Sequence, residues 1–251
     1  MEWARDFYSR TGSWWGNAES RGGADDQLRL QRLHRYAGDE PKRVLELGAG
    51  YGTTAALTAK AGHDVTAVEF SDRADFAPSA LRVRREDFYL VELPERFDVV
   101  CYWDGFGVGS DADQRRLLRR IAHEWLLPDG IALIDVYNPF VWAGWDGDEG
   151  HRMPDPARGY EHELFELATF DPVSCTATDT WWDAADPDHR ISQVLRCYTP
   201  ADLALLLGGT GLELFSITAG DETFAPPEQP ADRDLMRREN SYLAALRRER
   251  P

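Results

Sequence analysis

A glycine-rich segment between an apolar stretch and a helical one is the part of the chain best suited to hold a ligand. It runs Glu46-Leu47-Gly48-Ala49-Gly50-Tyr51-Gly52-Thr53. Glycines at such a junction let the backbone turn sharply and come close to a ligand, because a Cβ would occupy the ligand's space. In open α/β sheets this crevice, at the carboxyl ends of the strands, holds nucleotide cofactors. The segment therefore predicts a cofactor site.

The spacing of the glycines narrows the choice of cofactor. The dinucleotide fingerprint, GxGxxG or GxGxxA, requires glycine or alanine at its sixth position, where this chain has Thr53. No Gly-Lys-Ser or Gly-Lys-Thr follows the glycines, so a phosphate-binding P-loop is excluded. The pattern disfavours both NAD and ATP.

Alternating strands and helices position this segment. Helices are predicted over residues 26–37 and 53–61 and near Ala74, and one helix carries Leu117, Leu118, Ile121, Ala122 and Trp125 on one face. Strands are predicted over residues 43–47, 64–70, 81–84, 97–102 and 131–136, with a Pro128-Asp129-Gly130 turn before the last. This alternation predicts a Rossmann-like, doubly wound α/β fold with a mostly parallel sheet and helices on both faces.

The remaining chain departs from this alternation. The first 25 residues show no sustained period and are predicted to be an N-terminal arm or lid. Strand-like segments at 163–170 and 176–183 predict an insertion over the sheet after the fifth strand. A strand at 191–198, a helix from Pro200 to Gly208, a strand at 212–219 and a helix from Asp232 to Arg248 complete the chain.

We therefore predict one domain over residues 1–251, in four segments. Residues 1–40 form the lid and first helix, and 41–137 form the cofactor-binding core. Residues 138–190 form a substrate-covering insertion, and 191–251 form the final strands and a C-terminal helix. A chain of 251 residues is long enough to bury one full core of this kind.

The glycine segment and the acids after the next strands resemble a known family. Val44 to Thr53 resembles motif I, E/DxGxGxG, of the class I S-adenosylmethionine-dependent methyltransferases. Glu69 closes the second strand, where that family places an acid that accepts hydrogen bonds from both ribose hydroxyls. Asp87 and Phe88 follow the third strand, where the family contacts the adenine amine and ring face. The resemblance implies S-adenosylmethionine as cofactor, bound by Glu46, Gly48, Ala49, Gly50, Gly52, Glu69, Phe70, Asp87, Phe88 and Trp103.

Two later landmarks extend the resemblance. Phe97-Asp98-Val99-Val100 resembles the family's fourth strand, and Leu127-Pro128-Asp129-Gly130-Ile131 resembles the turn before its fifth. The five landmarks occur in order between Arg43 and Val136. The chemistry agrees, because this cofactor is a sulfonium cation without phosphate and suits a site rich in acids.

Side chains after the fourth and fifth strands are the candidates for catalysis. Methyl transfer is an in-line displacement, so the protein needs to align the nucleophile, exclude water and sometimes remove a proton. Asp104 can orient or deprotonate an amine or hydroxyl, and Tyr137 can do the same. For both residues a purely structural role in the pocket wall remains the alternative.

Aromatic side chains are dense in the segments expected to cover the cofactor. The predicted acceptor site includes Tyr8, Trp14, Trp15 and Trp142, which suit a flat or cationic small molecule, although some can belong to the core. Arg196-Cys197-Tyr198-Thr199-Pro200 resembles the R-x-Y-[ST] stretch of small-molecule methyltransferases. Arg196 is predicted either to bind an acidic substrate group or to fix the insertion.

Nucleic acid and metal are not expected as partners. The formal net charge of -16 repels phosphate backbones and anionic lipid surfaces. Asn138-Pro139-Phe140 lacks the second proline of the nucleobase amino-methyltransferase signature and follows the wrong strand. Asp135 with Asn138 is too small a set of oxygen ligands for a metal, so no metal is predicted.

The sequence therefore predicts methyl transfer from S-adenosylmethionine to N or O of a small-molecule metabolite. No secretory signal or membrane-spanning run is found, which predicts a cytoplasmic protein without a membrane partner. A homodimer is possible. Two alternatives stay open: an enzyme that uses the cofactor without methylation, as a cyclase does, and a non-catalytic cofactor-binding scaffold subunit.

Overall fold

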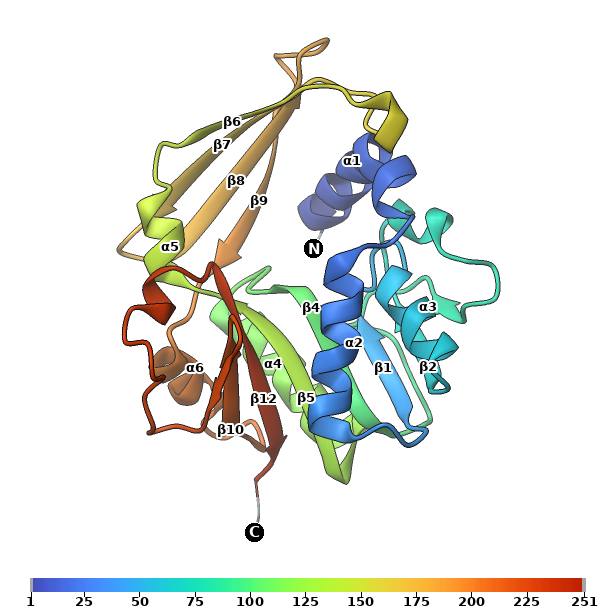
Figure 1. The fold of residues 1–251 in the computed structure, drawn as a ribbon, viewed down its shortest axis with the longest axis vertical. Coiled ribbons are helices and arrows are strands. Elements are labelled where there is room, and N and C mark those ends of the chain that lie inside the picture. The colour runs from blue at the N-terminus through green and yellow to red at the C-terminus, as the bar shows by residue number, and fades with distance from the viewer. Residues whose placement is uncertain (1, 250–251) are drawn as a thin grey trace.

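The computed structural model describes residues 2–249, and its centre is an eight-stranded sheet (Figure 1). The strand order is β11-β10-β12-β5-β4-β1-β2-β3. The strands from β3 to β5 are parallel, whereas β12, β10 and β11 join in antiparallel fashion. Their bounds are β1 Arg43–Leu47, β2 Asp64–Val68, β3 Val83–Arg84, β4 Phe97–Phe106, β5 Leu126–Tyr137, β10 Leu212–Ala219, β11 Glu222–Phe224 and β12 Ser241–Arg248. This arrangement confirms the predicted Rossmann-like, mostly parallel sheet.

Helices cover both faces of the main sheet, as predicted. On one face Leu33 of α2 and Ala55 of α3 pack with Val44 and Val65 of the strands. On the other face the helices α4 and α6 and the π-turn η2 pack against the sheet through Leu117, Leu203 and Ile121. The bounds are α2 Ala24–Ala37, α3 Thr53–Lys60, η1 Asp72–Phe76, α4 Asp111–Arg120, η2 Ile121–Trp125 and α6 Pro200–Leu207. The parallel strands are packed between these two hydrophobic cores. The carboxyl ends of the strands therefore hold fixed positions along one edge of the sheet.

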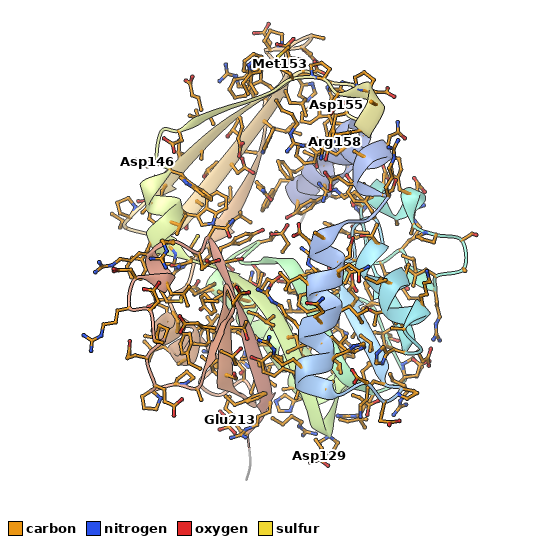
Figure 2. All side chains as sticks on the ribbon, viewed as in Figure 1. Asp129, Asp146, Met153, Asp155, Arg158 and Glu213 are labelled. Atoms are coloured by element: carbon orange, nitrogen blue, oxygen red, sulfur yellow. The ribbon has the colours of Figure 1, made fainter. Side chains whose placement is uncertain are left out.

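The insertion after β5 forms a second, antiparallel sheet in the order β6-β7-β8-β9. It stands over the carboxyl ends of the main strands, with α1 between it and η1 (Figure 1). Met153, Asp155 and Arg158 lie at its far end, and Asp129 and Glu213 lie at the opposite end of the molecule (Figure 2). The bounds are α1 Glu2–Glu19, α5 Pro139–Gly144, β6 Glu149–Arg152, η3 Pro156–Arg158, β7 Leu164–Asp171, β8 Thr176–Asp183 and β9 Ile191–Arg196.

The C-terminal segment corrects the sequence-based expectation. The helix predicted from Asp232 to Arg248 is wrong, because the structure has the short turn η4 (Leu235–Arg237) followed by strand β12. β12 is inserted between β5 and β10 and is antiparallel to both. Its residues 242–246 are all buried, as expected for a strand covered on both faces. A short, wholly apolar run does not distinguish a buried strand from a helix, which explains the error.

Two further segments differ from the prediction. The N-terminal arm is a regular helix, α1, that buries Ala4, Phe7, Thr11 and Trp14 on one stripe. The strand predicted at 191–198 is β9, which pairs with β8 in the insertion and not with the main sheet. The insertion sheet therefore extends to Arg196, beyond the expected limit at residue 190. Among the helices of residues 2–249, none has the length and apolar character needed to cross a membrane.

Candidate active site

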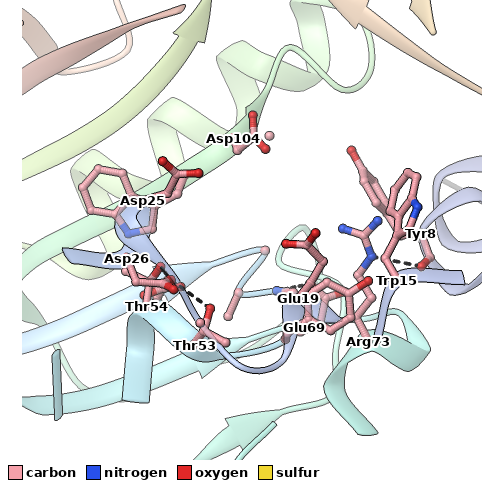
Figure 3. Close-up of a pocket in the computed structure, with 18 of the residues that line it drawn as sticks. Tyr8, Trp15, Glu19, Asp25, Asp26, Thr53, Thr54, Glu69, Arg73 and Asp104 are labelled. Atoms are coloured by element: carbon pink, nitrogen blue, oxygen red, sulfur yellow. Dashed lines mark hydrogen bonds between the residues drawn. The ribbon is translucent and has the colours of Figure 1, made fainter. Parts of the chain in front are cut away.

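A cavity of about 720 Å³ lies where the insertion and α1 cover the carboxyl ends of β1, β2 and β4. Most of the side chains predicted for the site line it. They are Tyr8, Trp15, Glu46, Gly48, Ala49, Gly50, Glu69, Phe70, Asp87, Phe88, Trp103, Asp104 and Tyr137. Asp104 and Glu69 reach the same space from different strands (Figure 3). The fold thus brings together residues that are far apart in sequence, although their individual roles stay predictions.

The glycine loop approaches the cavity with bare backbone. Gly48 and Gly50 have φ values of 60° and 55°, which favour glycine over any residue with a Cβ. A Cβ on Gly50 would meet no atom within 4 Å, so this position faces open space. A Cβ on Gly48 would come within 3.1 Å of the ring of Tyr102. The loop can therefore contact a ligand directly at Gly50.

Glu69 is fixed by backbone donors on both of its carboxylate oxygens. Oε2 accepts the N–H of Gly50 at 2.8 Å, and Oε1 accepts the N–H of Ser71 at 2.7 Å. The side chain is only 5% exposed. A carboxylate has about four lone-pair positions, so two N–H donors leave capacity for two further donors from the cavity. This pattern fits the pair of hydroxyls of a ribose.

Asp87 and Phe88 form another wall of the cavity. Asp87 Oδ1 accepts the N–H of Tyr89 at 2.8 Å, which fixes the carboxylate in the segment that follows β3. The ring of Phe88 packs edge-on against Tyr102, with ring centroids 5.4 Å apart. An acid beside an aromatic ring in the cavity wall suits a flat base that carries an amino group.

The start of α2 adds an acid–base cluster that sequence reasoning missed. Asp26 accepts hydrogen bonds from Thr53 Oγ1 at 2.8 Å and Thr54 Oγ1 at 2.6 Å, and so joins α2 to the helix after the glycine loop. Arg29, one turn later on the same helix, lines the cavity, and its Nη1 donates to Thr54 Oγ1 at 3.4 Å. The only sequence signal was the i, i+3 spacing of Asp26 and Arg29 in a helix that leads into β1.

Acidic side chains near Arg29 affect its charge. Burial raises the pKa of Glu46 to about 8, and the charge of Arg29 opposes this rise. Burial disfavours the charge of Arg29, but the carboxylates of Asp135, Asp104 and Glu46 raise its pKa. Arg29 therefore stays protonated and presents a cation to the cavity, which suits a carboxylate ligand.

Asp104 and Tyr137 form a hydrogen-bonded pair inside the cavity. The Tyr137 hydroxyl donates to Asp104 Oδ1 at 2.8 Å and approaches its carbonyl oxygen at 3.0 Å. Burial and then the charge of Asp104 raise the pKa of Tyr137 well above its usual value, so it remains a donor. Asp104 is exposed to the cavity and has a left-handed φ of 50° within an irregular stretch of β4. The pair presents a carboxylate that can hold a cation and accept a proton.

The roof of the cavity is made by α1 and the insertion. The Tyr8 hydroxyl donates to Gln193 Oε1 on β9 at 3.2 Å, and Tyr160 donates to Glu19 Oε1 at 2.7 Å. Arg73 of η1 lies over the ring of Tyr8, 4.9 Å from its centroid (Figure 3). These contacts close the space above the glycine loop. Gln193 and Tyr160 were not predicted, because their place depends on how the insertion packs, and Arg73 was not predicted, because its place depends on how α1 packs on η1.

Four predicted site residues lie outside the cavity lining. Gly52 is the left-handed N-cap of α3, where a Cβ would be 2.8 Å from Leu81. Trp14 is buried in an apolar cluster between α1 and the insertion sheet. Trp142 is buried against the ring of Tyr137, with ring centroids 5.6 Å apart. Arg196 forms an ion pair with Asp111 at 3.1 Å and donates to nearby carbonyls. Their positions match structural roles, and for Arg196 this was the stated alternative.

Within residues 2–249 no group of three or more His, Cys, Asp or Glu side chains could hold a metal ion. Burial raises the pKa of the Cys101 thiol well above its usual value and that of Cys197 to about 12. Both thiols are therefore protonated and unsuited to nucleophilic attack.

Comparisons with known proteins agree with this geometry. A family model described as a methyltransferase domain matches residues 23–217. The CcbJ methyltransferase from Streptomyces caelestis has 21% sequence identity and a TM-score of 0.70, with 91% of each chain covered. The sugar N-methyltransferase KedS8 from a Streptoalloteichus species has 21% identity and a TM-score of 0.63, covering 90% of this chain and 88% of that one.

A third similar structure is the Burkholderia thailandensis 1,6-didemethyltoxoflavin-N1-methyltransferase with bound 1,6-didemethyltoxoflavin and S-adenosylhomocysteine. It has 20% identity and a TM-score of 0.59, with 99% of this chain and 90% of that chain covered. No curated protein sequence matches significantly. Because the family model spans most of the chain and the main sheet carries the glycine loop at its carboxyl edge, this chain belongs to the class I S-adenosylmethionine-dependent methyltransferases.

Proposed function

We propose that this enzyme methylates the nitrogen of a small-molecule amine. The observation that carries the proposal is the carboxylate of Asp104, which is exposed within the cavity and oriented by the Tyr137 hydroxyl. The similar sugar N-methyltransferase and N1-methyltransferase structures support nitrogen as the methylated atom. Methylation of oxygen is the alternative outcome of the experiment below.

The residues of the cavity fit S-adenosylmethionine. Gly50 leaves open space, and Glu69 has acceptor capacity for the ribose hydroxyls. Asp87 and Phe88 suit the adenine, and Arg29 suits the carboxylate of the methionine part. The bound cofactor supplies an already activated methyl group on a sulfonium cation, so the protein's task is positioning and proton removal.

Asp104 can perform both parts of that task on an amine. Its carboxylate can accept a hydrogen bond from the amine N–H and so hold the nitrogen in place. It can then accept the proton that the nitrogen gives up on becoming methylated. The Tyr137 hydroxyl fixes one carboxylate oxygen, which leaves the other oriented to the cavity. The roof formed by Tyr8, Trp15 and the insertion covers part of the cavity and so limits the access of water to the nucleophile.

Calorimetric titration tests the cofactor half of the proposal. S-adenosylmethionine and S-adenosylhomocysteine are expected to bind, and NAD is not. Glu69→Ala is expected to weaken both by about 10-fold to 100-fold, because charge-assisted hydrogen bonds contribute about 1.5–3 kcal/mol. Glu95→Ala, at an exposed carboxylate away from the cavity, is the matched control. Unchanged affinity in Glu69→Ala would contradict the assigned ribose site.

Product analysis tests the reaction. Incubation with a panel of small amines and alcohols is expected to give S-adenosylhomocysteine together with amines that are heavier by one methyl group. Methylthioadenosine in place of S-adenosylhomocysteine would show a different use of the cofactor. Binding without turnover of any panel member would favour the scaffold alternative, and methylation of alcohols alone would reassign the methylated atom to oxygen.

A further inference from the structure

The inner face of the insertion sheet carries polar side chains that the proposed reaction does not use. Asp179 of β8 and Gln193 of β9 are directly paired across the two strands. Gln193 lines the cavity beside Tyr8. Asp179 lies behind it and is 5% exposed. Together they form a polar group on the roof, on a different element from the cofactor loop.

Asp179 determines which way the Gln193 amide points. Gln193 Nε2 donates to Asp179 Oδ2 at 2.7 Å. A carboxylate accepts only N–H or O–H donors, so the amide nitrogen must face Asp179 and the amide oxygen must face away. Gln193 Oε1 accordingly receives the Tyr8 hydroxyl at 3.2 Å. A carbonyl oxygen has two lone pairs, so Oε1 retains capacity for one more donor.

The burial of Asp179 requires an explanation. Desolvation of a carboxylate is costly unless donors compensate it, and Asp179 Oδ1 receives no N–H or hydroxyl donor. Its neighbour Glu166 is itself an acid that shares a side-chain hydrogen bond with Asp179, and burial, the charge of Asp179 and this bond raise the pKa of Glu166 to about 7. A merely structural partner for Gln193 does not need a charge at this place. A fixed orientation of the Gln193 amide does need an acceptor that cannot also donate.

We infer that Gln193, positioned by Asp179, binds a hydroxyl or amino group of the acceptor and selects molecules that carry such a group besides the methylated nitrogen. This inference rests on the proposed function, since the second group is additional to the nitrogen that Asp104 would hold in the same cavity. Tyr8 lines the same cavity as Asp104, and its hydroxyl donates to Gln193. The acceptor class is thus an amine with a second hydrogen-bond donor.

Binding to the protein saturated with S-adenosylhomocysteine tests the inference. The probes are 2-, 3- and 4-aminocyclohexanol, which sample the separation of the two groups, and cyclohexylamine, which lacks the hydroxyl. At least one aminocyclohexanol is expected to bind about 10-fold more tightly than cyclohexylamine, the effect of one hydrogen bond of about 1.4 kcal/mol. Equal affinities, or binding of none of the aminocyclohexanols, would overturn the inference.

Two variants assign the preference to these residues. Gln193→Met keeps the side-chain length without the acceptor oxygen and is expected to abolish the preference, whereas Gln27→Met, on an exposed face of α2, is expected to retain it. Asp179→Asn presents both a donor and an acceptor, so the Gln193 amide is no longer fixed in one orientation; the preference is expected to fall below that of the unaltered protein but to stay above that of Gln193→Met, because a hydroxyl can also accept from the amide nitrogen. A preference that survives in Gln193→Met would overturn the inference.

Kinetics separate positioning from a structural effect. In Gln193→Met, KM for the preferred aminocyclohexanol is expected to rise about 10-fold, whereas in Gln27→Met both KM and kcat are expected to stay as in the unaltered protein. The affinity for S-adenosylhomocysteine is expected to stay constant in all variants, which shows that they fold. If S-adenosylhomocysteine fails to bind the unaltered protein, the proposed function fails; if it binds and both amines are used equally, only this inference fails.

Discussion

The charge of the Asp104 side chain and the conformation of its backbone can be tested separately by substitution. Its φ of 50° is left-handed, which costs a residue with a Cβ about 1–2 kcal/mol relative to the right-handed region. Asp104→Ala and Asp104→Gly both remove the carboxylate and its hydrogen bond with Tyr137. They differ only in the Cβ, so their difference in stability measures the backbone strain. Part of the gain in the glycine variant is offset by the greater entropy of its unfolded chain, about 0.5–1 kcal/mol.

We therefore expect Asp104→Gly to be more stable than Asp104→Ala by about 1 kcal/mol, or about 2–4 °C in Tm for a chain of this size. Asp104→Asn tolerates the left-handed backbone and keeps an oxygen for Tyr137, so its stability should match that of the unaltered protein. It lacks the negative charge, and kcat/KM for an amine should fall by about 100-fold or more.

The assays are urea unfolding and initial-rate kinetics on the same preparations. Full activity in Asp104→Asn would refute the role of the charge, because the geometry is retained in that variant. Equal stability of the alanine and glycine variants would refute the argument from backbone strain. A strained carboxylate that contributes to activity, but not to stability, is the pattern expected of a functional position.

Three other predictions follow from the charges of the structure. Arg29→Gln should weaken binding of S-adenosylhomocysteine by about 10-fold to 100-fold but leave methylthioadenosine, which lacks the amino-acid group, unaffected; an equal loss for both would exclude the carboxylate role. Glu166→Gln should raise Tm more at pH 8 than at pH 5. The pKa of Glu166 is raised from 4.5 to about 7 in the folded state, so ionisation of this group lowers the stability of the unaltered protein as pH rises through that window. Glu149→Gln, exposed on β6, should show no such difference. His63 and His34 share a hydrogen bond of 3.1 Å between their Nε2 atoms, and burial and the neighbouring ring lower the pKa of His63. The contribution of neutral His63 to stability is present above its unfolded pKa of about 6.5 and is lost as pH falls below it, so urea unfolding of His63→Gln should depend less on pH between 7.5 and 5.5.

The cofactor half of the site could be predicted from sequence because its determinants are local. Gly48, Gly50 and Glu69 occupy the ends of successive parallel strands, and such ends always meet at one edge of a sheet. Arg29 escaped prediction because it reaches the loop through helix packing. The contact of Asp26 with Thr54 spans 28 residues and leaves no periodic signal.

The acceptor half could not be predicted to the same extent, as two adjacent tryptophans illustrate. Trp14 and Trp15 have the same chemistry, but successive residues on a helix point about 100° apart, so α1 buries one and turns the other to the cavity. Which of them lines the site depends on how α1 rotates against the insertion. Only tertiary packing determines that rotation, and the same holds for Trp142 and Gln193.

The two halves of the cavity also differ in what a substitution can change. The cofactor side is built from strand ends that are packed between two hydrophobic cores, so the main sheet fixes its backbone positions. The roof meets α1 through Tyr8 with Gln193 and through Glu19 with Tyr160, all side-chain contacts beyond the main sheet. Substitutions in the roof should therefore alter the choice of acceptor while the affinity for the cofactor stays constant. Substitutions in α1 and on the inner face of the insertion sheet are therefore the ones that should identify the acceptor, since the glycine loop belongs to the cofactor side of the cavity.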